Sequence, residues 1–261
     1  MSSIPDPPVY EMPLDPTFAL AMFGSVALVA VVLATRLAVR NRDPLPVAAC
    51  VGAMICAFNE PIFDVLAKIG YPVLPPAAVA YTAFGRSIPW FLVIGYIPWV
   101  GLVPYVVMRR MHAGLPRRTL YLIAAGLCAS VAATEIINAA GLHAWAYYGQ
   151  TAWRGHLGGG TVQMAAMPLV LALIYYVFVS NMGAGSRIVA ALPLTFAATT
   201  WPLYVSNYSD LPEIARWGAA ALSVALCLAV IRAVAHVAEG WATRRATVDV
   251  DQPALERTVR A

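Results

Sequence analysis

The chain has 261 residues, of which 61% are hydrophobic and only 11% are charged, with a formal net charge of +4. Soluble domains carry about 25% charged residues, so this composition excludes an ordinary soluble protein and predicts a polytopic membrane protein. The basic excess does not indicate nucleic-acid binding, because the basic residues stand in short clusters between apolar segments, which is how membrane topology is encoded.

Seven apolar segments are long enough to cross a bilayer, which takes about 20 residues as a helix. We therefore predict an all-α, polytopic integral membrane protein with seven transmembrane helices. A polar N-terminal segment (1–17) precedes the seven-helix membrane domain (18–238), and a charged cytoplasmic tail (239–261) follows it. The predicted spans are 18–39, 46–67, 88–108, 119–142, 160–180, 187–206 and 214–237.

The distribution of Lys and Arg predicts the orientation of these spans. Thirteen of the 17 lie on one side, which should be cytoplasmic by the positive-inside rule. The four on the other side are Lys68, Arg86, Arg154 and Arg216. Seven spans then place the N-terminus outside and the C-terminus inside, in what we expect to be a bacterial plasma membrane. Most of the candidate functional residues fall toward the non-cytoplasmic side.

Two carboxylates at the end of the second span are the first candidate site. Glu60 and Asp64 are four residues apart, which places both on one face of a helix. Carboxylates at the edge of hydrocarbon are costly and are functional candidates by default. We interpret them as a desolvated pair in which one member keeps its proton and acts as a general acid while the other acts as a base. The alternative is that they only end the span at the interface, with Lys68 paired at the next i,i+4 step. Asn59, beside Glu60, suggests a helix break and a substrate contact.

A third carboxylate, Glu135, ends the fourth span after a neutral run that begins at Thr119. Asn138 follows at the i,i+3 position, where its amide could hold the carboxyl by a hydrogen bond. The plain alternative is a structural hydrogen bond between helices. We favour a second wall of the same site.

The stretch that follows is rich in aromatic residues, with Trp145, Tyr147 and Tyr148 as candidate substrate contacts. Tryptophan and tyrosine at this depth are often interface anchors. The alternative is an aromatic wall whose ring faces stabilise a cationic intermediate. Tyr96 and other aromatic residues within the spans are more typical of a core or a belt.

No pattern in the chain predicts a metal or a cofactor. His143 and His156 lack the dense spacing of a metal site, and the four cysteines lie in apolar runs without ligand spacing. The last span contains no lysine for a retinal Schiff base, and no aspartate-rich diphosphate motif is present. The glycines at 158–160 follow no strand, so they do not indicate a phosphate loop.

With these residues identified, the chain resembles the AveC-type spirocyclase family of actinobacterial membrane proteins. The resemblance rests on a motif in the second span and the loop after it, and on a weaker similarity at Glu135 and in the 147–150 segment. The motif reads Glu60-Pro61-x-x-Asp64, Tyr71-Pro72, and Tyr81-Thr82-Ala83-Phe84-Gly85-Arg86-x-Ile88-Pro89.

The resemblance implies spiroketal formation on a polyketide by acid-assisted dehydrative cyclisation without a redox cofactor. On this basis Glu60, Asp64 and Glu135 would supply acid and base. Arg86 would orient a substrate oxygen or hold a carboxylate ionised, and Tyr147 or Tyr148 would line the cation. The expected partners are the lipid bilayer and a lipophilic small-molecule substrate, polyketide- or isoprenoid-like, and the expected enzyme type is a cyclase or dehydratase.

Two other functions stay open at this stage. A membrane terpene cyclase would use the same acidic residues to protonate an epoxide or an alkene. A non-enzymatic transporter or lipid-binding protein would use intramembrane carboxylates for proton coupling. The clustering of polar residues at one end of the spans favours an enzyme or a binder over a transporter.

Overall fold

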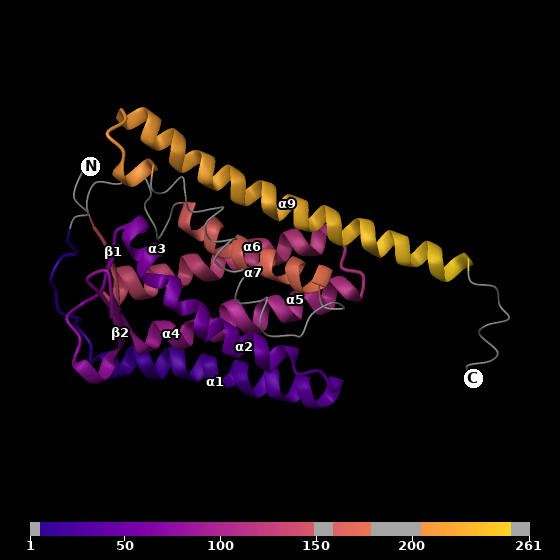
Figure 1. The fold of residues 1–261 in the computed structure, drawn as a ribbon, viewed down its shortest axis with the longest axis horizontal. Helices are drawn as coiled ribbons and strands as arrows, with labels where there is room; N and C mark the ends of the chain where they lie inside the picture. Colours follow the sequence, from indigo (N-terminus) through magenta and orange to yellow (C-terminus); the bar gives the residue numbers. More distant parts are fainter. Residues whose placement is uncertain (1–5, 149–158, 179–204, 252–261) are drawn as a thin grey trace.

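The structure is a computed structural model, and it describes residues 6–148, 159–178 and 205–251. It is mostly helical, as predicted. The long helices run side by side along the length of the molecule, and the short strands gather at one end (Figure 1). We call this the strand end and the opposite one the basic end, which carries the Arg109–Arg110 and Arg117–Arg118 pairs.

The first helical segments follow the predicted spans closely. α1 (Pro16–Asn41) begins with Asp15, whose side chain accepts a hydrogen bond from the Thr17 backbone N–H at 2.8 Å. It ends where Arg42 adopts a left-handed backbone with φ of 50°. The second span is composite and consists of α2 (Leu45–Cys56), the 3₁₀ turn η1 (Ala57–Asn59) and α3 (Glu60–Ala67).

Short strands connect the second and third spans. β1 (Ile69–Gly70) is followed by the 3₁₀ turn η2 (Pro76–Ala78) and by the antiparallel hairpin of β2 (Val79–Ala83) and β3 (Arg86–Pro89). The tip of the hairpin has positive φ at Phe84 (50°) and Gly85 (71°). The third span then runs through α4 (Trp90–Tyr96), the π-helical turn η3 (Ile97–Leu102) and α5 (Val103–His112).

The remaining elements complete the bundle. α6 (Arg117–Glu135) continues as the π-helical turn η4 (Ile136–Gly141). β4 (Ala146–Tyr147) pairs with β1, so that Ile69 lies opposite Tyr147. α7 (Gly159–Phe178) and α9 (Glu213–Asp251) follow, with a further helical turn at 205–208. α9 extends into the segment predicted as a charged tail, which is helical through Asp251.

Five helical segments are long and apolar enough to cross a membrane, and they match five predicted spans. The fifth predicted span coincides with α7, while most of the sixth lies outside the described residues. The count of seven and the orientation therefore remain predictions. The five segments are 16–41, 45–67, 90–112, 117–141 and 213–240.

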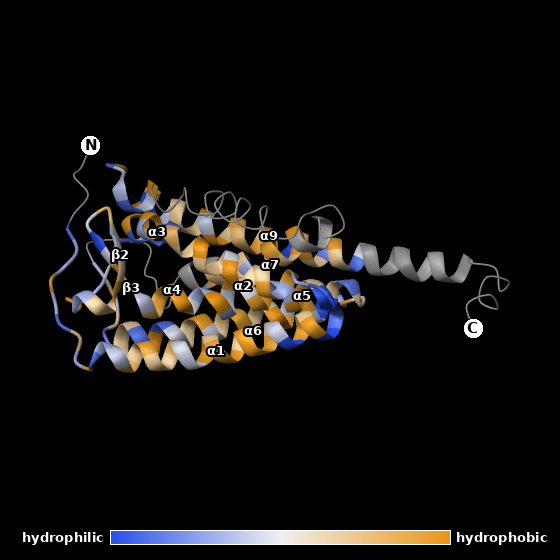
Figure 2. Cartoon of the chain, turned by 60° about the horizontal axis from the view of Figure 1, so that its bottom comes forward, coloured by the Kyte–Doolittle hydropathy of each residue, from blue (hydrophilic) through white to orange (hydrophobic). Residues whose placement is uncertain are grey.

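Apolar residues cover the length of the helices, and hydrophilic residues gather at the ends (Figure 2). In the apolar stretch of α1 only 22% of the residues are buried, whereas in the apolar stretch of 90–112 the buried share is 61%. The exposed side chains of α1 are mostly aliphatic, as expected for a surface that faces lipid.

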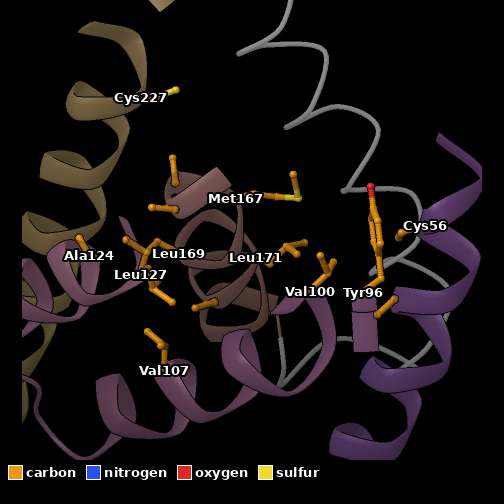
Figure 3. Packing of buried hydrophobic residues seen from close by; sticks show 14 of the residues in the cluster. Cys56, Tyr96, Val100, Val107, Ala124, Leu127, Met167, Leu169, Leu171 and Cys227 are labelled. Carbon is orange, nitrogen blue, oxygen red and sulfur yellow. The ribbon is translucent and has the colours of Figure 1, made fainter. Parts of the chain in front are cut away.

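Close packing between the second and third spans depends on Gly101. A Cβ at this position would lie 2.8 Å from the Cys50 Cα and 3.1 Å from the Ala49 carbonyl oxygen. Small residues permit such close approach between membrane helices. The apolar core extends from here to α7, and Tyr96 stands at its edge beside Cys56 (Figure 3). The hydroxyl of Tyr96 is thus delivered from the third span toward the carboxylates of the second.

Candidate functional site: three carboxyl groups hydrogen-bonded to tyrosines

Glu60 and Asp64 occupy one face of α3, as the i,i+4 spacing predicted. Pro61 at the first helical turn and the 3₁₀ turn before it separate α3 from α2. Both carboxyl groups are buried, with Glu60 7% exposed and Asp64 fully covered. Asn59 is half-buried on the 3₁₀ turn directly before them. Burial of two carboxyl groups on one helical turn requires compensation from hydrogen-bond donors.

Lys68 does not provide this compensation by the predicted i,i+4 pairing with Asp64. It ends α3 in a left-handed conformation with φ of 57°, so it no longer continues the helical face. Its ammonium lies over the ring of Tyr208 instead, 5.0 Å from the centroid. The alternative in which Lys68 pairs with Asp64 one helical turn earlier is therefore wrong, because the helix ends at Lys68 before the pair can form.

Tyrosine hydroxyls fill that role. The Tyr71 hydroxyl lies 3.3 Å from Glu60 Oε1 and 3.0 Å from Asp64 Oδ1, and the Tyr96 hydroxyl donates to Glu60 Oε2. Burial, followed by electrostatic interaction with Asp64 and Glu60, raises the pKa of Tyr71 well above its ordinary value. Tyr71 therefore stays neutral and keeps the proton that it shares with the carboxyl pair.

Glu135 joins the same site from the end of α6. Its Oε2 accepts hydrogen bonds from Trp145 Nε1 at 3.0 Å and from the Tyr147 hydroxyl at 3.1 Å. Burial raises the pKa of Tyr147, and the charges of Glu135, Glu60 and Asp64 raise it further. One phenol thus lies within electrostatic range of all three predicted carboxyl groups, which the fold brings together from positions 60, 64 and 135.

The β1–β4 ribbon positions this contact. It places Tyr147 opposite Ile69, directly after the helix that carries Glu60 and Asp64. The Tyr148 N–H continues the ribbon with a hydrogen bond of 2.9 Å to the Lys68 carbonyl oxygen. Tyr147 of β4 and Tyr148 directly after it thereby hold the fourth span against the end of the second.

Arg86 lies beside this group without an ion pair to it. The guanidinium is 5% exposed, and its Nη1 donates to the Phe84 carbonyl oxygen at 2.8 Å. Its Nη2 donates to the Tyr148 hydroxyl, and Cζ lies 6.0 Å from the centroid of that ring. The guanidinium remains within electrostatic range of Asp64.

Asn138 does not bind Glu135 in the way that the spacing suggested. Its amide donates instead to the Thr134 carbonyl oxygen at 2.8 Å. The reason is the π-helical turn η4 after Glu135, which changes the helical register and moves the i+3 side chain off the face of Glu135. Asn138 is nevertheless buried, at 2% exposure, and its backbone carbonyl oxygen accepts from the Ala144 N–H at 2.8 Å.

Tyr71 and Tyr96 are the site residues that sequence reasoning did not select. Tyr71 was part of the motif that carries the family resemblance, and Tyr96 was interpreted as core or belt. A hydroxyl that would be buried in an apolar span needs an acceptor, which is the signal that points to them. Tyr96 also directly precedes the π-helical turn η3, just as Glu135 precedes η4. Such turns often occur at functional sites.

Within the described residues, no three His, Cys, Asp or Glu side chains are grouped in a way that could hold a metal ion. His143 is exposed with φ of 51°, and His156 lies outside the described residues.

Comparisons of the chain with protein-family models, with curated proteins and with solved structures found no match. The arrangement of the site itself, a buried carboxyl pair connected to a proton-bearing phenol, is suited to proton transfer.

Proposed function

We propose that the chain is a membrane-embedded cyclase that uses carboxyl acid/base catalysis, without a cofactor, on a lipophilic substrate. The reaction would pass through a cationic intermediate, and the family resemblance favours the spiroketal-forming type. The observation that carries the proposal is the bridge from Glu60 through the Tyr71 hydroxyl to Asp64.

The bridge bears on which carboxyl holds a proton. A hydroxyl carries one hydrogen, so Tyr71 can donate fully to only one of its two carboxyl neighbours. The other contact becomes a hydrogen bond when that carboxyl is itself protonated and donates to the tyrosine oxygen. A buried pair with one shared proton contains both an acid and a base, which is the pairing that dehydrative cyclisation needs.

The hydrogen-bond donors around each carboxyl favour Asp64 as the protonated member. Glu60 can accept from both Tyr96 and Tyr71, which suits a carboxylate. Asp64 Oδ2 is buried and has no hydrogen-bond partner among the described residues. A negative charge is less costly on the group with two donors.

The proposed reaction follows from these assignments. Asp64 donates a proton to the hydroxyl oxygen of a substrate hemiketal, the bond between that oxygen and the ketal carbon breaks, and water leaves with the donated proton. A substrate hydroxyl attacks the oxocarbenium ion, and Glu60 takes the proton released by that hydroxyl. Glu135 and the rings of Trp145 and Tyr147 stabilise the positive charge between these steps. The Lys and Arg distribution supports a location of the site toward the non-cytoplasmic side of a bacterial plasma membrane.

The test is metabolite and lipid profiling of the source cell with the gene deleted and then restored as wild type, Glu60→Gln or Glu135→Gln. Glu213→Gln is the matched control, since Glu213 is an exposed carboxylate at the same end of the bundle. We expect deletion and Glu60→Gln to accumulate a compound that is one water heavier than the missing product.

Other outcomes would change the proposal. An accumulated compound of the same mass as the missing product would point to an isomerising, terpene-type cyclase. Metabolites that are unchanged in amount and only redistributed across the membrane would replace the enzyme with a transporter. Full turnover in both Glu60→Gln and Glu135→Gln would show that the assigned carboxyl groups are not catalytic.

A further inference from the structure

A second group of charges lies beside the three carboxyl groups. Lys68 lies over the ring of Tyr208, Arg86 lies beside the ring of Tyr148, and Arg216 is within electrostatic range of Lys68. We call these three basic residues the cationic cluster. The Lys68 ammonium is 5.0 Å from the Tyr208 centroid, and the Arg86 Cζ is 6.0 Å from the Tyr148 centroid. Two cations over tyrosine rings, with a third nearby, are unusual at the end of a membrane bundle, where Lys and Arg more often extend into water.

Electrostatic effects link the members of the cluster. Burial raises the pKa of Tyr208 to about 12, and Tyr148 raises it while the charge of Arg86 opposes the shift. Burial lowers the pKa of Lys68, and the positive charge of Arg216 lowers it further. Arg86 therefore acts on the ring that Lys68 covers, and Arg216 acts on Lys68 itself.

The two arginines of the cluster each have a buried Nε–H group without an acceptor in the described part of the chain. Arg86 is 5% exposed, Lys68 is 7% exposed and Arg216 is half-buried. The Nε–H groups of Arg86 and Arg216 are buried and have no acceptor within residues 6–148, 159–178 and 205–251. In that part of the chain, neither guanidinium forms an ion pair with a carboxylate. A buried guanidinium without an anionic partner is costly, so each such group calls for an explanation.

The position of the cluster relates it to the catalytic carboxyls. Tyr147 ends β4, and Tyr148 follows it directly, with a side chain that has a different partner. Tyr147 contacts Glu135, while Tyr148 contacts Arg86. Lys68 directly follows the helix that carries Glu60 and Asp64, and the Tyr148 N–H donates to the Lys68 carbonyl oxygen. The cluster therefore lies next to the end of that helix.

We propose that the cationic cluster binds the carboxylate or phosphate head group of an amphiphilic substrate, whose apolar part extends toward Glu60 and Asp64. Two guanidinium groups offer planar pairs of donors that match an oxyanion, and the lysine adds a compact charge. Binding of the head group stands on the cluster alone. Only the placement of the apolar part rests on the proposed cyclase function.

Binding can be measured on the full chain in nanodiscs of phosphatidylcholine. The probes are radiolabelled decyl phosphate and decanoate, with labelled decanol as the neutral analogue and inorganic phosphate as a competitor. Retention is counted in excess of empty nanodiscs. We expect saturable binding of at least one anionic probe and none of decanol. Displacement by millimolar inorganic phosphate would identify a site for a free anion, whereas displacement by phosphatidylglycerol in the disc would identify a site for a lipid head group.

Variants of the cluster test which residues bind the head group. Arg216→Gln and Arg86→Lys should each weaken binding of the anionic probe about tenfold, since each removes donors to a charged group. Arg118→Gln is the control, because Arg118 is an exposed arginine at the basic end. Arg216 is only half-buried, so we expect the Arg216→Gln chain to fold. The test therefore remains valid if a change at the buried Arg86 prevents folding. Equal binding by Arg216→Gln, Arg118→Gln and wild type would overturn the proposal, as would equal retention of decanol.

Asp64→Asn separates this proposal from the proposed function. It should abolish turnover in the source cell and leave binding of the anionic probe intact. Intact binding in a chain that changes no metabolite would keep the head-group site and remove the cyclase. Turnover by the wild type without any binding of anionic probes would keep the cyclase and remove the head-group site.

Discussion

The two ends of the helical bundle both carry charged residues, but these side chains are buried at the strand end and exposed at the basic end. At the strand end, Asp64 is fully covered and Arg86 is 5% exposed. At the basic end, the ion pair between Arg117 and Glu239 has side chains that are 45% and 42% exposed. Exposed pairs contribute little to stability, whereas buried charges must be compensated by specific partners. The same residue types are thus exposed at one end and buried in a candidate site at the other.

The largest expected effect is that of Asp64→Asn, which removes the proposed acid and keeps the shape of the side chain. Turnover should fall by about 100-fold or more, because general acid catalysis contributes about 10² to 10⁴. The measurement is the product-to-precursor ratio in cells that carry the variant. Asp210→Asn, at an exposed position of the same end, should match wild type. Equal ratios for both variants would make Asp64 a structural residue.

Tyr71→Phe should have the next largest effect, since it removes the one hydroxyl that lies between the two carboxyl groups. We expect turnover to fall about tenfold and the free energy of unfolding to fall by about 1–3 kcal/mol, because buried acceptors lose their donor. Thermal unfolding in detergent and the metabolite ratio measure the two effects. The control is Tyr121→Phe, at a tyrosine that is 39% exposed. If the two variants behave alike, the bridge has no role.

Tyr147→Phe should have a smaller effect, because Glu135 keeps the Trp145 N–H as a donor. A loss of turnover of about three- to tenfold is expected from one hydrogen bond to a carboxylate. The double variant with Trp145→Phe should lose more than the sum of the two single effects in free energy, since it leaves the carboxylate without either donor. Additive losses in free energy would mean that the two donors are not coupled through their hydrogen bonds to Glu135.

The smallest effect is expected at the basic end. Arg117→Gln and Glu239→Gln should leave turnover unchanged and should not shift the unfolding midpoint measurably, because the pair is exposed and screened by salt. The midpoint in detergent at low and at high salt is the measurement. A loss of activity in either variant would contradict the placement of the functional site at the strand end alone.

Much of the membrane architecture could be predicted from local sequence, because length and hydrophobicity determine whether a helix can span lipid. The five helical segments described as possible spans match predicted ones, and α7 coincides with a sixth. The i,i+4 relation of Glu60 and Asp64 was also predictable, since helical geometry sets it. Asn138 shows the limit, because a π-helical turn that the residue pattern does not reveal changed its partner.

What the sequence by itself determined is the set of apolar spans, the sides on which charges gather and the face that Glu60 shares with Asp64. Tertiary structure decided which partners those carboxyl groups meet. Tyr96 comes from the third span and Glu135 from the fourth, 36 and 75 residues beyond Glu60. Only the packing of these spans places the Tyr96 hydroxyl on Glu60, and only the β1–β4 ribbon brings Tyr147 within range of all three carboxyl groups. The physical reason is that burial and hydrogen-bond partners depend on contacts between segments, whereas span length and helical spacing depend on the segment alone.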